Sequence, residues 1–123
     1  MEKEKEKQTV LIVDDEAVIR LFVRVILEDA GHEVKEASNA DDALRLIADD
    51  GITVVLTDMD MPGSMDGLAL VRNVAGRWPN IGVVVTSGRR LPRPDEMPRE
   101  TRFPSKPFSG ERLIGVVGDA CPH

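Results

Sequence analysis

The sequence predicts an α/β fold in which helices cover both faces of a doubly wound, open parallel sheet. Short apolar runs alternate with amphipathic helical stretches along the chain, which is the pattern of successive strand–helix units. The run at residues 52–57 is apolar on both sides of the pleat, as expected of a central parallel strand that is covered on both faces. The 123 residues fit one domain, since a domain commonly holds about 100–200 residues.

The first half of the chain predicts two strand–helix units. The first strand is expected at residues 9–13 and the first helix at residues 16–30. Residues 33–37 are half polar, which is typical of an edge strand. Ser38 or Asn39 can cap the second helix. Four apolar residues share the face of the first helix that we expect to be buried: Val18, Phe22, Val25 and Ile26.

The second half continues the alternation with one interruption. A third helix is expected to end at Pro79, a fourth strand spans residues 81–86, and a short fifth strand lies at about residues 101–104. Proline in that last strand restricts it to an edge of the sheet. Three prolines between the fourth and fifth strands disfavour a helix interior. We therefore expect a fourth helix that is shortened or replaced by a proline-rich loop, and a final helix at about residues 109–120.

Composition limits the classes of function. The formal net charge of −6 argues against direct binding to nucleic acid. No apolar run approaches the roughly 20 residues of a membrane span. The single cysteine, Cys121, allows no internal disulfide, and a cytoplasmic location is the simplest interpretation. Residues 1–8 alternate in charge and are expected to form a mobile lead-in to a domain at residues 9–121.

Polar residues stand where the predicted strands end: Asp14, Asp15, Asp58, Thr86 and Lys106. In an open parallel sheet, ligands bind just beyond the carboxyl ends of the strands. Carboxylates, a hydroxyl and an ammonium gathered there would hold a divalent cation and a phosphoryl group. Mg²⁺ fits this set because it prefers oxygen ligands, and crowded carboxylates without a cation would repel one another.

Each of these residues also has an ordinary structural explanation. Asp14 and Asp15 can be acids at a helix start, where carboxylates suit the helix dipole. Asp58 can be a turn residue, Thr86 a hydroxyl at a strand end, and Lys106 a solvated charge. Their common placement at strand ends favours a single site over separate coincidences.

Four segments in this order resemble the receiver domain of two-component response regulators. They are residues 13–16 (VDDE), 57–63 (TDMDMPG, with Asp66-Gly67 beyond), 85–88 (VTSG) and 106–108 (KPF). The resemblance covers about residues 9–120. It implies a flavodoxin-like sheet of five parallel strands in the order 2-1-3-4-5, carried by a stand-alone receiver similar to chemotaxis regulators.

The resemblance also implies a role for each site residue. Asp58 matches the acceptor that becomes an aspartyl phosphate, and with Asp15 it would bind Mg²⁺ directly. Asp14 would bind the ion through water, and the backbone carbonyl of Asp60 would complete the coordination. Lys106 would contact a phosphoryl oxygen in a charge-assisted hydrogen bond.

Two further positions match the switch of the family. Thr86 would hydrogen-bond a phosphoryl oxygen and move to do so, and Phe103 would turn inward when Thr86 moves. The proline-rich stretch replaces a helix that usually contributes to the output and dimer face. We therefore expect a monomer or a weak dimer.

The function implied is a phosphoacceptor signalling switch rather than a turnover enzyme. A histidine kinase or a histidine phosphotransfer protein would donate the phosphoryl group, and an unidentified downstream protein would respond. Two alternatives remain open. Asp58 and Asp60 also resemble the start of a haloacid-dehalogenase-like phosphatase, and the chain can be a receiver-like interaction module that is never phosphorylated.

Overall fold

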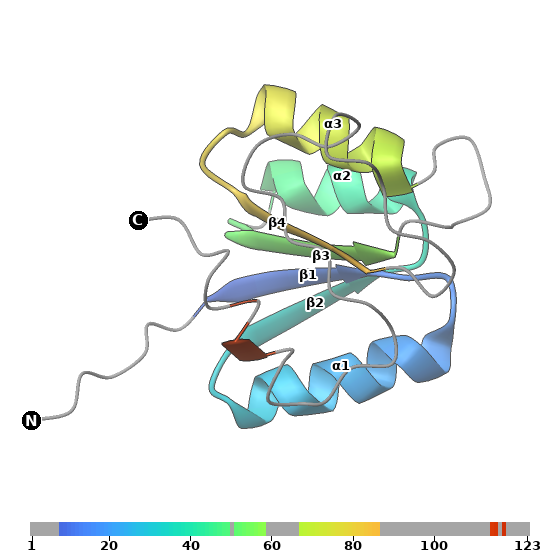
Figure 1. Cartoon of the computed structure of the whole chain (residues 1–123), viewed down its shortest axis with the longest axis vertical. Coiled ribbons are helices and arrows are strands. Elements are labelled where there is room, and N and C mark those ends of the chain that lie inside the picture. Colours follow the sequence, from blue (N-terminus) through green and yellow to red (C-terminus); the bar gives the residue numbers. More distant parts are fainter. Residues whose placement is uncertain (1–7, 50, 59–66, 87–113, 116, 118–123) are drawn as a thin grey trace, which may run out of the picture.

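The structure is a computed structural model that describes residues 8–49, 51–58, 67–86, 114, 115 and 117. A parallel sheet lies between two helical layers, with α1 on one face and α2 and α3 on the other (Figure 1). No helix among the described residues combines the length and apolarity needed to cross a bilayer. The elements are β1 (Thr9–Val13), α1 (Ala17–Asp29), β2 (Glu33–Ala37), α2 (Ala40–Asp49), β3 (Val54–Asp58), α3 (Gly67–Arg77) and β4 (Gly82–Thr86).

The sheet has the strand order β2-β1-β3-β4, and every pairing is parallel. This confirms the predicted order as far as the described strands extend. The expected fifth strand and the proline-rich stretch lie outside the described residues, while residues 114, 115 and 117 are helical as predicted for the last helix. Because the strands are parallel, the carboxyl ends of β1, β3 and β4 meet at one edge.

β3 connects the two cores of the protein. All five of its residues are buried, as predicted for a central strand. Val55 packs into the core beneath α2 and α3, whereas Val54 and Leu56 pack into the core beneath α1. Burying one such side chain stabilises the fold by about 1.5–3 kcal/mol, so β3 holds its carboxyl end rigidly.

The orientation of α1 differs from the prediction. Its buried residues are Val23 and Leu27, with Ile19 and Ile26 packed against the same core. Of the four residues expected to be buried, only Ile26 lies on this face. The other three are exposed, together with a further leucine: Val18 (78%), Leu21 (60%), Phe22 (49%) and Val25 (57%).

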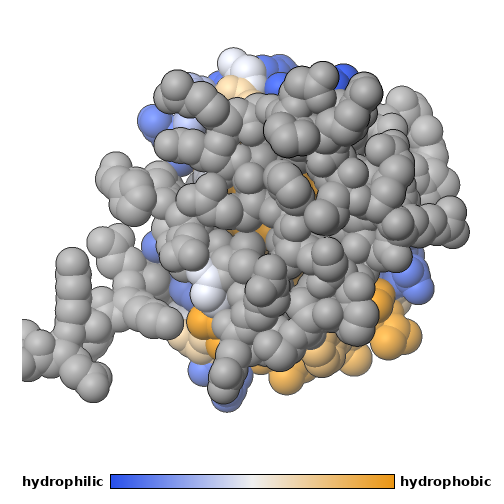
Figure 2. Space-filling view, in the orientation of Figure 1, coloured by the Kyte–Doolittle hydropathy of each residue, from blue (hydrophilic) through white to orange (hydrophobic). Residues whose placement is uncertain are grey.

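The physical reason is that α1 is apolar on two sides. Both stripes have helical spacing, so periodicity alone does not determine which one faces the sheet. The observed rotation buries Val23 and Leu27. It also lets Arg20 and Arg24 bind Glu36 on the edge strand β2, while the second stripe faces outward. Figure 2 shows apolar surface along the lower edge of the molecule, where Figure 1 places α1.

The helix ends follow the sequence signals. The side chain of Asn39 accepts a hydrogen bond from the Asp42 backbone N–H at 2.8 Å, so Asn39 rather than Ser38 caps α2. After α1, Gly31 has a φ of +99°, a conformation that glycine adopts without strain. These ends fix the lengths of the helices and hence the positions at which the next strands begin.

Polar contacts hold the amino end of the sheet. The Gln8 backbone N–H donates to Nδ1 of the buried His32 at 3.1 Å. The hydroxyl of Thr53 lies 2.9 Å from Oε1 of Gln8, and it accepts a hydrogen bond from the Thr9 backbone N–H at 3.1 Å. These bonds connect the segments that precede β1, β2 and β3, and so they help to set the register of the sheet.

Candidate metal and phosphoryl site

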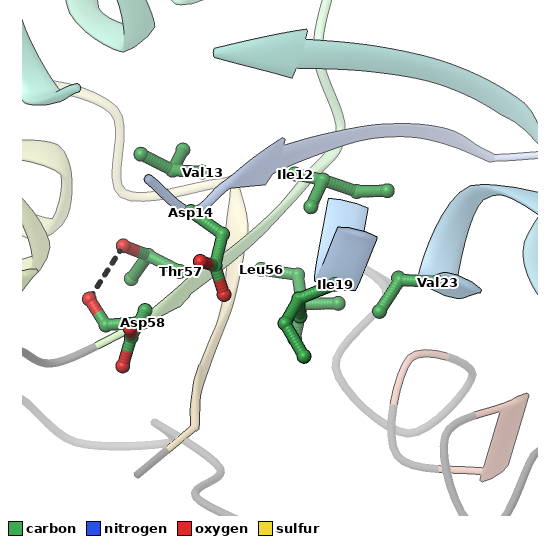
Figure 3. A pocket seen from close by; sticks show the side chains of 8 residues that line it. All are labelled: Ile12, Val13, Asp14, Ile19, Val23, Leu56, Thr57 and Asp58. Carbon is green, nitrogen blue, oxygen red and sulfur yellow. Dashed lines mark hydrogen bonds between the residues drawn. The ribbon is translucent and has the colours of Figure 1, made fainter. Parts of the chain in front are cut away.

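Asp14 and Asp58 lie next to one another at the carboxyl edge of the sheet. β1 and β3 pair with Val13 opposite Thr57, so the next residue in each chain segment is an aspartate. Both aspartates are buried, at 3% and 7% exposure. They line one pocket (Figure 3), whose remaining walls are apolar except for Thr57.

Asp14 is held from three directions. Its backbone N–H donates to the carbonyl of Ala37 on β2 at 3.1 Å. Its side-chain Oδ1 accepts a hydrogen bond from the Glu16 backbone N–H at 2.9 Å. Its backbone carbonyl accepts a hydrogen bond from Nη1 of Arg20 at 2.6 Å. The carboxylate of Asp14 is therefore positioned by the sheet, by the start of α1 and by a side chain of α1.

A compact group of acids lies at this edge. Asp14, Asp15 and Glu16 each present a carboxylate oxygen, and these oxygens lie within 4.8 Å of one another. Asp14 is buried, whereas Asp15 and Glu16 are exposed. A set of oxygen donors of this kind suits Mg²⁺ or Ca²⁺ rather than a softer metal. Asp58 is not a member of this group, but it adjoins it through the pocket that it shares with Asp14.

The pocket has one charged end and one apolar end. Beyond the two aspartates its walls come from β1, β3 and α1 and include Ile12, Ile19 and Leu56 (Figure 3). An apolar wall reduces the screening of charges by water. Electrostatic contacts made at the aspartates are therefore stronger than they would be on an open surface.

The predicted site residues divide into three groups. Asp14, Asp15 and Asp58 are brought to the same edge of the sheet. Thr86 is the last residue of β4 and pairs with Asp58 in the strand register. The other three residues, Asp60, Phe103 and Lys106, lie outside the described residues.

Sequence reasoning assigned no site role to Glu16 or Arg20. The structure places Glu16 in the acid group and at the N-cap of α1. The sequence did contain a signal for the contact made by Arg20, because helical side chains lean toward the amino end of their helix. An arginine one turn after Glu16 can thus reach back to the residues that precede α1.

Arg20 belongs to an ion network between α1 and β2. Nε of Arg20 lies 3.0 Å from Glu36, and Nη1 of Arg24 lies 2.6 Å from the other oxygen of the same carboxylate. Arg24 also pairs with Glu28 at 3.1 Å. The hydrogen bond from Arg24, assisted by that from Arg20, lowers the pKa of Glu36 although partial burial opposes this change. The same contact with Glu36 raises the pKa of Arg24.

Known proteins share this fold. The family described as response regulator receiver domain matches residues 10–117. A response regulator receiver protein from Sinorhizobium medicae WSM419 has a similar structure, with a TM-score of 0.86, 30% identity and 94% coverage of both chains. Because the match covers 94% of both chains, the likeness extends over nearly the whole fold.

Two curated relatives are longer. A putative response regulator described as NtrX-like, from Rickettsia bellii (strain RML369-C), is 33% identical over 91% of this chain and 24% of its own length. A protein-glutamate methylesterase/protein-glutamine glutaminase 3 from Hahella chejuensis (strain KCTC 2396) is 46% identical over 67% of this chain and 24% of its own length. The match spans about a quarter of each relative, so their whole-protein activities do not transfer with it.

The family match gives no support to the phosphatase alternative built on Asp58 and Asp60. Receiver domains are generally signalling modules without a turnover activity of their own, and members of the family are phosphorylated on an aspartate with Mg²⁺. The chain belongs to the receiver domain family of two-component response regulators, the phosphoacceptor switches of these systems.

Proposed function

We propose that Asp58 is the residue that accepts the phosphoryl group, and that Asp14, Asp15 and Asp58 hold the Mg²⁺ ion that the family uses. One observation carries this proposal: Asp58 and Asp14 are buried side by side in one pocket, beside an acid group composed of oxygen donors. The carboxylate of Asp58 is positioned by a fully buried strand, which suits a group that must meet an incoming phosphorus atom.

The reaction transfers one phosphoryl group. A carboxylate oxygen of Asp58 forms a bond to phosphorus, the bond from phosphorus to the donor's histidine nitrogen breaks, and the imidazole leaves with its electron pair. The product is an aspartyl phosphate. Bound Mg²⁺ would neutralise negative charge on the carboxylate and phosphoryl oxygens. Asp15 and Asp58 would bind the ion directly, Asp14 would do so through water, and Asp60 would contribute its backbone carbonyl.

The response to phosphorylation is assigned to three residues by resemblance. Lys106 would bind one phosphoryl oxygen and Thr86 another, and Phe103 would follow the movement of Thr86. The register of β3 and β4 supports the part given to Thr86, because Asp58 and Thr86 are paired across the two strands.

The phosphoryl donor is a histidine kinase or a histidine phosphotransfer protein, and we propose that it docks on the exposed stripe of α1. This stripe consists of Val18, Leu21, Phe22 and Val25. It begins one helical turn after Asp15, so a protein seated on it stands beside the pocket. Exposed apolar patches commonly mark protein interaction sites.

Charge narrows the choice of partner for this stripe. Acids flank both ends of it, with Asp15 and Glu16 at one end and Glu28 and Asp29 at the other, and all four are exposed. A second copy packed antiparallel on α1 would bring acids against acids, which is unfavourable. A donor with an apolar centre and a basic rim fits better. The protein itself is then a monomer or a weak dimer.

The overall role proposed is a switch that signals by binding a downstream protein, whose identity is unknown. The chain is not proposed to bind nucleic acid or a membrane, or to turn over a substrate. The net charge of −6 supports the exclusion of nucleic acid. A single cysteine supports a cytoplasmic location, since cytoplasmic proteins seldom depend on disulfides.

Acetyl phosphate with Mg²⁺ tests the proposal without a partner protein. Intact-mass spectrometry is expected to show one phosphoryl adduct that is labile to base. The adduct should be absent in Asp58→Asn and when EDTA replaces Mg²⁺. The matched control is Asp60→Asn, which keeps the backbone carbonyl and should keep the adduct. An adduct that persists in Asp58→Asn, or none in the wild-type chain, contradicts the proposal.

A further inference from the structure

Arg20 connects two parts of the molecule with one guanidinium group. Its Nη1 donates to the backbone carbonyl of Asp14 at 2.6 Å, and its Nε donates to the carboxylate of Glu36 at 3.0 Å. The side chain is mostly shielded, with 18% exposure. Contacts of this type, one step behind a metal ligand, orient the ligand and tune its affinity for the metal.

We propose that Arg20 is a positioning residue for the metal site, and that Glu36 neutralises its charge so that the positioning does not repel the cation. The proposal rests on the proposed function, because it takes Asp14 as part of the Mg²⁺ site. It adds two residues, Arg20 and Glu36, that lie outside the acid group.

The geometry supports positioning rather than a simple link between helix and sheet. Asp14 is the first residue after β1, and its backbone carbonyl is the atom that Arg20 binds. The amide and Oδ1 of Asp14 are held by Ala37 and Glu16. Arg20 therefore adds a third fixed point, and the direction of the carboxylate depends on all three.

The charges explain why Glu36 is needed. A guanidinium beside a cation site repels the cation. Glu36 accepts hydrogen bonds from Arg20 and from Arg24, while Arg24 is paired in addition with Glu28. Two arginines thus face two glutamates, and their formal charges cancel. With its charge neutralised, Arg20 contributes to the site through the fixed geometry of its guanidinium hydrogen-bond donors.

The direction in which Arg20→Met changes the affinity for Mg²⁺ distinguishes a positioning role of Arg20 from a purely electrostatic one. If Arg20 acted only as a nearby positive charge, Arg20→Met would strengthen Mg²⁺ binding. If Arg20 positions Asp14, the same substitution weakens binding, by about tenfold for a contact of this kind. Isothermal titration calorimetry of the unphosphorylated full chain with MgCl₂ at low ionic strength gives the dissociation constant directly.

Two matched variants control for charge and for the network. Arg45→Met removes a positive charge from an exposed site on α2 that pairs with Asp42, and Arg24→Met removes the other arginine bound to Glu36. Both are expected to keep the Mg²⁺ dissociation constant within about twofold of wild type, since Arg45 binds Asp42 and Arg24 binds Glu28 and Glu36, all outside the acid group. A tenfold loss in Arg45→Met would overturn the proposal, because weaker Mg²⁺ binding would then not depend on the contact between Arg20 and Asp14.

Conservative variants keep the test decisive if Arg20→Met fails to fold. Arg20→Lys keeps the charge but lacks the planar fork, and it is expected to weaken Mg²⁺ binding at least threefold. Glu36→Gln leaves Arg20 in place without its counter-charge, and it should also weaken binding. Wild-type affinity in a folded Arg20→Lys or Arg20→Met chain overturns the positioning role, and wild-type affinity in Glu36→Gln overturns the part given to Glu36.

Failure of the proposed function would appear differently. A wild-type chain that accepts no phosphoryl group from acetyl phosphate contradicts the role of Asp58, whatever the calorimetry shows. A wild-type chain that binds Mg²⁺ and is phosphorylated, with an Arg20→Met variant of equal affinity, contradicts only the inference about Arg20.

Discussion

Asp58 and Thr86 are paired across β3 and β4, each as the last residue of its strand. Of the residues of β4, Thr86 is the one that lies opposite Asp58. It is therefore well placed to respond to a chemical group added to Asp58. Because β3 is buried along its whole length, we expect β3 itself to move little when a phosphoryl group is added to Asp58. The end of β4 is therefore the expected place of the response.

The Thr86 variants should separate phosphorylation from response. Thr86→Ala is expected to take up a phosphoryl group from acetyl phosphate but to lose most of the change that phosphorylation causes in backbone amide chemical shifts. Thr86→Ser keeps the hydroxyl and is expected to keep the change. The measurement is a pair of ¹⁵N–¹H spectra for each variant, with and without acetyl phosphate. Equal changes in chemical shift in Thr86→Ala and wild type would show that Thr86 has no part in the switch.

The exposed stripe of α1 should matter to a protein donor only. Phe22→Ser is expected to slow transfer from a kinase or phosphotransfer protein that phosphorylates the wild type by about tenfold or more, because truncation of a central aromatic residue at an interface commonly costs about 2 kcal/mol. The rate with acetyl phosphate should not change. Arg45→Ala, on α2, is the surface control. An equal loss with both donors would show that Phe22 acts on the site and not on docking.

Two leucines of the same helix test the orientation of α1. Leu27 is fully buried, whereas Leu21 is 60% exposed. Leu27→Ala is expected to lower the free energy of unfolding by about 2–5 kcal/mol, and Leu21→Ala by no more than about 0.5 kcal/mol. Urea unfolding of the two variants provides the comparison. A larger cost at Leu21 than at Leu27 would mean that the other stripe faces the sheet.

The Glu36 carboxylate should contribute to stability above mildly acidic pH. Its pKa in the folded chain is lowered from the ordinary value of 4.5, first by the hydrogen bond from Arg24. A lowered folded-state pKa means that the contribution is present above 4.5 and is lost as the pH falls through the folded-state value. Urea unfolding from pH 3 to pH 7 gives the free energy of unfolding of wild type and of Glu36→Gln. The two values should converge at acidic pH, and wild type should become the more stable chain as the pH rises. A constant difference between them would contradict this linkage.

The local pattern of the sequence determined where the strands lie and which acids follow them, because each depends on neighbours in the chain. It left the cap of α2 open between Ser38 and Asn39, and the structure decided for Asn39. β1 and β2 were predicted with the bounds that the structure shows. The order of the strands came from the resemblance to receivers, since local patterns carry no information on which strands become neighbours. The match to the family over residues 10–117 agrees with that order.

Tertiary contacts alone decided the rest. Which stripe of α1 is buried depends on its packing against the sheet and on its contacts with β2, and periodicity cannot distinguish two apolar stripes of similar spacing. The contact between Arg20 and the Asp14 carbonyl also depends on how the chain turns from β1 into α1. Local sequence selects the elements because their energetics are local, whereas the rotation of a helix and the neighbours of a carboxylate depend on residues that meet only when the sheet has formed.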